Sequence, residues 1–318
     1  MEKINVGIDI SKKKFDVCIL LPNSKALTKI FNNDNKGFAD LFEWLELKKV
    51  GLCRVAIEAT GCYGEDLARV LYNKGHTVFI INPAQIKYFG KSKLSRAKTD
   101  KKDARLIAEF ASTYPQLKPW IPLAASQEKL KNLYRHLDRL KADHAQLLNR
   151  LESIRDEDVK KLSTAQLDFV KNQIEDLQKQ IRLHIKSDSD LKEKEALLLT
   201  IPGVGEALCW AVLSEVPDLE NFRDAKQLAA FAGLNPTVCE SGTSVRGRGG
   251  ISKTGSSFFR KMLYLPSMNA MRFNPIIKPF ADTLRAKGKK GKVIVIACMR
   301  KLLHIIYGVL IKKQPFAG

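Results

Sequence analysis

The first 35 residues contain three apolar runs separated by short polar stretches. The runs are INVGIDI (4–10), FDVCILL (15–21) and ALTKIFNN (26–33). Only a few polar residues separate neighbouring runs, which is the spacing of strands joined by short turns. The pattern therefore predicts an antiparallel meander at the start of the chain.

The next 80 residues alternate between helical and strand-like patterns. Apolar residues recur at helical spacing in three segments, and two apolar runs are typical of buried strands. The helical segments are 38–45, 65–73 and 99–111, and the strand-like runs are 54–60 and 76–83. Strands that alternate with helices indicate an α/β unit. We therefore expect residues 1–122 to form an α/β domain with a mixed sheet.

Two leucine-rich seams mark the middle of the chain, with a polar break at 155–165 between them. Their alternating spacing of three and four residues is typical of a coiled coil. The seam positions are Leu130, Leu133, Leu137, Leu140, His144, Leu147, Leu151 and Ile154, then Leu167, Val170, Ile174, Leu177, Ile181 and His184. The seams could pair with each other or with another copy of the chain. Residues 123–195 are interpreted as a coiled-coil oligomerisation arm, in which the two histidines set the register.

The last third, residues 196–318, is predicted to be a mainly α-helical domain. Helical segments flank the turn IPGVG at 201–205, and further helices are expected at 225–232, 254–272 and 291–311. The turn resembles half of a helix-hairpin-helix, in which glycines let backbone N–H groups reach a phosphate. A glycine turn between packed helices is the alternative interpretation.

Basic side chains outnumber acidic ones at both ends of the chain. The sequence has 54 Lys and Arg against 34 Asp and Glu, a formal net charge of +20. Residues 126–195 are close to neutral, with 15 basic and 14 acidic side chains. The excess at the ends indicates a polyanionic partner, either nucleic acid or an acidic membrane surface.

The apolar pattern argues against a membrane protein. The longest apolar run, 293–299, is followed by Arg300 and Lys301, and is too short to span a bilayer. The first residues do not show the pattern of a signal peptide. Six cysteines lack metal-ligand spacing, so we expect reduced thiols in a cytoplasmic protein.

Four acidic residues lie at predicted element ends within the α/β domain. Asp9 and Glu58 end strand-like runs, and Asp100 and Asp103 lie three apart at the start of a helix. Carboxylates gathered at one sheet edge would repel one another unless Mg²⁺ or Mn²⁺ neutralised them. Each acid also has an ordinary explanation, since strand ends are solvated and acids are favoured in a first helical turn. As a set, the order is typical of ribonuclease-H-like nucleases.

A second cluster, residues 240–264, combines glycines, hydroxyl side chains and cations. From Glu240 to the end of the chain, 16 basic residues stand against 2 acidic ones. The density of guanidinium and amide groups suits phosphate binding, and a solvated basic loop is the alternative. The candidate phosphate contacts are Arg246, Arg248, Lys253, Arg260 and Lys261, with Lys289, Lys290 and Lys292 in the later basic loop RAKGKKGK.

Taken in order, the motifs resemble those of the bridge-RNA-guided DEDD transposases, the recombinases of insertion-sequence family one-ten and relatives of the Piv DNA invertases. The resemblance spans nearly the whole chain. It is carried by GIDIS (7–11), IEATGCY (57–63), INPAQIK (81–87), TDKKDA (99–104), IPGVGE (201–206), FAGLNP (231–236), ESGTSVRG (240–247), ISKTG (251–255) and GKKGKV (288–293).

The resemblance implies a RuvC-like domain, a coiled coil and a C-terminal transposase domain. It implies that Asp9, Glu58, Asp100 and Asp103 bind the metal, and that Ser241 is a nucleophile that becomes joined to DNA, with Ser244 as second choice. It further implies a structured guide RNA that pairs with donor and target DNA, a homo-oligomer (a dimer or a tetramer), and a tetrameric synapse in which the serine of one protomer completes the metal site of another. The protein would be cytoplasmic in a bacterium and associated with the nucleoid when bound to DNA.

Two other functions compete with a recombinase. A RuvC-type junction nuclease would use water as the nucleophile, and the serine segment would only bind phosphate. A non-enzymatic nucleic-acid-binding protein would not need the acids at all, although clustered acids are unfavourable beside a polyanion. The sequence has no GxxxxGK[ST] loop, which agrees with strand rejoining that conserves bond energy in a covalent link instead of using ATP.

Overall fold

The computed structural model describes two compact units, residues 1–122 and 123–318. It describes residues 4–22, 25–59, 61, 63–93, 100–216, 218–237, 240–241, 245–246 and 250–318, without the side chains of 100–101, 240–241 and 245–246.

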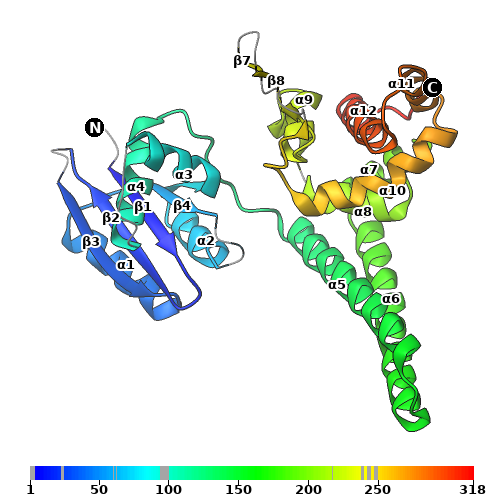
Figure 1. The fold of residues 1–318 in the computed structure, drawn as a ribbon. Helices are drawn as coiled ribbons and strands as arrows, with labels where there is room; N and C mark the ends of the chain where they lie inside the picture. The colour runs from blue at the N-terminus through cyan, green and yellow to red at the C-terminus, as the bar shows by residue number, and fades with distance from the viewer. Residues whose placement is uncertain are drawn as a thin grey trace. The chain divides into compact units, whose positions relative to one another are not determined.

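The first unit is built around a five-stranded mixed sheet in the order β3-β2-β1-β4-β5 (Figure 1). Its elements are β1 (Asn5–Ile10), β2 (Lys14–Leu20), β3 (Ala26–Asn32), α1 (Asn35–Leu47), β4 (Arg54–Glu58), α2 (Glu65–Asn73), β5 (Thr77–Ile81), α3 (Pro83–Ser92) and α4 (Asp100–Thr113). β1, β2 and β3 form the predicted antiparallel meander, and β4 and β5 add in parallel to β1. The mixed α/β fold expected for this region is confirmed.

Helices cover both faces of the sheet because successive strand residues point to opposite sides. Even-numbered β1 residues such as Ile8 pack with α1 and α2 in one apolar cluster, which includes Leu41 and Leu67. On the other face, Ala56 packs with Ile107 in the cluster made by α3 and α4. The sheet is therefore a middle layer, and the face that carries α4 also carries the odd-numbered side chains of β1.

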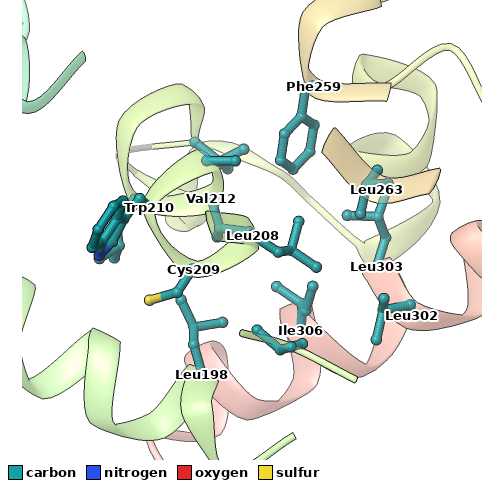
Figure 2. Close-up of a cluster of buried hydrophobic side chains, with 14 of the residues drawn as sticks. Leu198, Leu208, Cys209, Trp210, Val212, Phe259, Leu263, Leu302, Leu303 and Ile306 are labelled. Atoms are coloured by element: carbon teal, nitrogen blue, oxygen red, sulfur yellow. The ribbon is translucent and has the colours of Figure 1, made fainter. Parts of the chain in front are cut away.

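The second unit is mainly helical. Its elements are α5 (Ala125–Ser153), α6 (Glu157–Ser187), α7 (Ser189–Leu199), α8 (Glu206–Glu215), a short 3-10 helix η1 (Leu219–Asn221), α9 (Ala225–Phe231), α10 (Ser257–Phe273), α11 (Ile277–Ala286) and α12 (Gly291–Lys312), with the two-residue strands β6 (Pro236–Thr237), β7 (Glu240–Ser241), β8 (Val245–Arg246) and β9 (Gly250–Ile251). The fully buried side chains of Trp210 and Phe259 lie in its core, together with residues from α7 and α12 (Figure 2).

The two long helices α5 and α6 pack against each other within one chain (Figure 1). Seam residues from both helices, among them Leu137 and Ile181, belong to the same apolar cluster as the C-terminal helices. The sequence had left open whether the seams pair with each other or with another copy, and intrachain pairing is observed. The predicted polar break is shorter than expected, because the Asp156 side chain caps a helix that starts at Glu157.

Side chains fix the base of this helical hairpin to α8. The Tyr134 hydroxyl donates to the carbonyl of Ala207 at 2.6 Å, and the Arg135 guanidinium pairs with both carboxylate oxygens of Glu215. Arg182 of α6 makes a similar two-bond pair with Glu206. The hairpin is thus part of the packed helical unit rather than a flexible appendage.

α12 is long and apolar enough to cross a membrane when judged by length and composition alone. Half of its most apolar 18-residue window is buried inside the protein. Residues such as Leu302 and Ile306 point into the core that α12 shares with α8 and α10 (Figure 2). This burial is the pattern of a core helix.

Candidate active site

Asp9 and Glu58 lie side by side at the carboxyl edge of the central strands. β1 and β4 are parallel and in register, with Ile8 opposite Ile57, so Asp9 and Glu58 are the next residues along the two strands. Both are partly buried. By the two-residue period of a strand, they share the face of the sheet that α4 covers.

The direction of α4 brings its acidic start to the same edge. Near its carboxyl end, the carbonyl oxygens of Ala111 and Pro115 accept hydrogen bonds from Arg54, which is the first residue of β4. α4 therefore runs antiparallel to β1 and β4, and its first turn lies at the carboxyl ends of these strands. That turn contains Asp100 and the partly buried Asp103.

Close contact between α4 and β1 depends on Gly7. A Cβ atom at this position would lie 2.2 Å from the carbonyl oxygen of Ala104 and 2.3 Å from the backbone nitrogen of Ala108. α4 is also tied to the end of α3, because the Glu109 carboxylate accepts from Lys93, the residue that follows α3, as well as from Arg105 of α4 itself. These contacts fix the position of α4 relative to β1, the strand that carries Asp9.

Gly7→Ala is expected to lower the free energy of unfolding by about 3 kcal/mol, because the added methyl group would push α4 away from β1. Urea denaturation followed by circular dichroism measures the change. Gly51→Ala is the matched control, since a Cβ atom there meets nothing within 4 Å. Unchanged stability in Gly7→Ala would show that α4 does not pack on β1 as described.

The sequence prediction missed a fifth carboxylate at this edge. Asp16 lies opposite Asp9 in the antiparallel pair of β1 and β2, so both side chains leave the same face of the sheet. It is 4% exposed, and its Oδ2 atom lies 3.8 Å from Nζ of Lys14. The available signal was a single charge inside the apolar run 15–21.

The donor chemistry of this edge suits a hard divalent cation, because carboxylate oxygens are the preferred ligands of Mg²⁺ and Mn²⁺. Among the described residues, no three His, Cys, Asp or Glu side chains form a group that could hold an ion. Asp100 is a member of the predicted set whose side chain lies outside the described residues.

Cys18, in β2, is the nucleophilic side chain buried beneath α4, where it packs against Ala104 and Ala108. Burial raises the pKa of its thiol to about 11, so the group is protonated at neutral pH. A buried neutral thiol is a poor nucleophile. Cys18 therefore acts as a small apolar side chain in the core.

The predicted nucleophile belongs to the second unit. Ser241 is the second residue of β7, and its backbone pairs with Val245 of β8, while Glu240 pairs with Arg246. The side chains of Ser241 and Arg246, and all of Ser244 and Arg248, lie outside the described residues. At the base of this segment β6 pairs with β9, with Thr237 opposite Gly250.

The other predicted phosphate contacts fall in two groups. Lys253, Lys289, Lys290 and Lys292 are exposed, and Lys261 is exposed while its Nζ atom lies 2.8 Å from Oδ1 of Asp138. Arg260 is partly buried, and its Nη1 atom donates to the carbonyl oxygen of Ala232 at 2.9 Å. That bond gives Arg260 a structural role, which its place in a basic sequence cluster had not indicated.

Two transposase families match this chain, each over a different part of it. A DEDD transposase family of the IS110 type matches residues 6–157, and the transposase family IS116/IS110/IS902 matches residues 195–282. The pilin gene-inverting protein of Moraxella bovis is 34% identical over 99% of this chain and 98% of its own length. The transposase of insertion sequence element IS1328 from Yersinia enterocolitica is 25% identical over 81% of each chain. The chain belongs to the IS110 family of transposases, and the pilin gene-inverting proteins are homologues of it.

Proposed function

We propose that this protein is a site-specific DNA recombinase that cuts and rejoins strands by transesterification, with Ser241 as the nucleophile. The observation that supports the proposal is that Asp9 and Glu58 follow paired positions on β1 and β4, and that α4 begins at the carboxyl ends of these strands. Family membership supports DNA as the substrate. The guide RNA and the tetrameric synapse come from the motif resemblance and are part of the proposal.

Asp9, Glu58, Asp100 and Asp103 would hold Mg²⁺ or Mn²⁺, which would polarise the scissile phosphate and stabilise the developing negative charge on its oxygens. The amino-terminal end of α4 carries a partial positive charge, beside which acidic side chains are favoured. Asp9 and Glu58 extend from strand ends, which are rigid parts of the sheet. Such a site needs little rearrangement when the phosphate arrives.

In the proposed reaction, the Ser241 oxygen loses its proton and forms a bond to phosphorus. The bond between phosphorus and one sugar oxygen breaks, and that oxygen takes up a proton as the free end of the strand. Arg246, which lies opposite Glu240 in the β7–β8 pair, supplies a cation near the phosphate. The reverse attack by a sugar hydroxyl of an exchanged strand releases Ser241 and reseals the DNA without ATP.

The experiment is to incubate the native protein and the RNA that co-purifies with it with a DNA duplex in the presence of Mg²⁺. The duplex is labelled on both sides of the cleavage site and nicked so that cleavage cannot reverse. We expect a protein–DNA adduct that survives denaturation, and mass spectrometry should place the modified residue in the peptide that contains Ser241. Omitting Mg²⁺ is the control. An adduct mapped to another side chain would contradict the assignment of the nucleophile.

The second candidate function is a RuvC-type junction nuclease, which the carboxylates at the edge of a mixed sheet favour on their own. Water would then attack the phosphate directly. The same incubation distinguishes the two, because a nuclease yields nicked DNA that is free of protein. That product without any adduct would replace the recombinase proposal by this one.

A further inference from the structure

The helical unit contains a pocket of about 930 Å³ that the reaction proposed above does not use. α5, the turn before α8, α10 and α12 contribute to its walls. Much of the lining is apolar, including Leu208, Met262, Ile296 and Met299. The predicted phosphate-binding turn at 201–205 contributes Gly203 and Gly205 to one wall. A volume of this size accommodates a nucleotide.

Cations and an aromatic ring lie where this pocket opens to solvent. Tyr264 is 39% exposed and Leu265 is 68% exposed, and both line the pocket. Lys261 and Lys292, which also line it, are exposed as well. Among the described residues that line the pocket, Asp138 carries a carboxylate, and its Oδ1 atom lies 2.8 Å from Nζ of Lys261.

We propose that this pocket binds a single unpaired DNA nucleotide, whose base stacks on Tyr264 while Lys292 contacts the adjoining phosphate. The inference rests on the proposed function, because strand exchange separates paired bases and so presents unpaired nucleotides to the protein. An apolar cavity with an accessible aromatic ring is the environment that an extruded base requires. Asn269, an exposed pocket residue, offers donors and an acceptor to the base edge.

Charge decides between DNA and a protein segment as the occupant. The chain from Glu240 onward has 16 basic and 2 acidic residues, and the basic segment 285–292 ends at Lys292. A second copy of the chain would bring like charge toward this surface, whereas a phosphate backbone brings the opposite charge. The complementarity therefore favours a polyanion with a planar apolar group.

The test measures equilibrium binding in EDTA, so that the result does not depend on strand cleavage. The probes are two fluorescein-labelled DNA hairpins, one with a single unpaired thymine and one with an abasic residue at that position. The native protein is expected to bind the thymine hairpin at least about tenfold more tightly. Tyr264→Ala should remove this difference and Tyr264→Phe should keep it. Lys292→Ala should weaken binding of both hairpins equally.

Phe273→Ala is the matched control, because Phe273 is an aromatic residue of α10 that is 72% exposed and does not line the pocket. It should leave both affinities unchanged. Equal binding of the two hairpins by the native protein would overturn the proposal, even if Tyr264→Ala failed to fold. Tighter binding of an RNA hairpin than of its DNA equivalent would also overturn the proposal. So would a Tyr264→Ala variant that sediments differently from the native protein but binds DNA equally well, because this result would assign the surface to contact with a second copy of the chain. Because the binding measurement requires no cleavage, the difference in affinity between the two hairpins still tests the pocket if Ser241 proves not to be the nucleophile.

Discussion

Ser241→Ala is expected to abolish the covalent protein–DNA adduct and to slow strand cleavage by at least about 10³-fold, because a methyl group cannot attack phosphorus. DNA binding should be retained, since the basic residues of the second unit remain. The adduct is measured by denaturing electrophoresis of labelled DNA, and binding by mobility shift. The protein should fold normally, because the substitution removes one oxygen atom from a residue of the short strand β7.

Ser244→Ala is the matched control for this prediction. It removes the same group three residues further along the chain, and the motif resemblance places Ser244 second as a nucleophile. Ser244→Ala should form adduct at the native level. If instead Ser244→Ala lost the adduct and Ser241→Ala kept it, the two roles would be exchanged. If both variants kept it, a serine of this segment would not be the nucleophile.

Asp9→Asn should reduce strand cleavage by at least about 10³-fold without lowering thermal stability. The amide has the shape of the carboxylate but lacks the charge that would hold a divalent cation beside Glu58. DNA affinity measured in EDTA should stay the same or rise, because the substitution removes a negative charge that faces the phosphate backbone. Cleavage is measured as nicked or adducted DNA over time, and stability as the melting temperature.

An exposed acid of α1 provides the comparison for Asp9. Asp40→Asn removes the same charge from a solvated helix position, and we expect native cleavage from it. Native cleavage by Asp9→Asn would remove this residue from the catalytic set. A loss of cleavage together with a loss of DNA affinity would assign Asp9 to binding or folding instead.

The sequence predicted the strands and most helices because their local patterns are strong. It missed α3, since Pro83 was interpreted as the end of a strand. In the structure the Asn82 side chain caps the helix and Pro83 is its first residue, a position where the fixed φ angle of proline is favourable. The helix α11 also went unassigned, because its 10 residues include a proline and have no side-chain cap.

The sequence indicates which acids belong to the candidate site but not how they are arranged. Local patterns indicated that Asp9 and Glu58 end strands, yet the parallel pairing of β1 with β4 joins segments about 50 residues apart. The direction of α4 depends on Arg54 and on the missing side chain of Gly7, which are tertiary contacts. Asp16 was overlooked for the same reason, since only strand pairing brings it opposite Asp9.

Because α5 and α6 are fixed to α8, the helical hairpin is a rigid extension of the helical unit. A helix of 31 residues such as α6 extends about 46 Å, and its base is packed into the core that also holds α10. A partner that binds the far end of the hairpin would therefore determine the orientation of the entire helical unit. Inserting one residue midway along each helix would turn the tip by about 100°. The hairpin can therefore be lengthened without a change in the direction that its tip faces only by insertions close to whole helical turns.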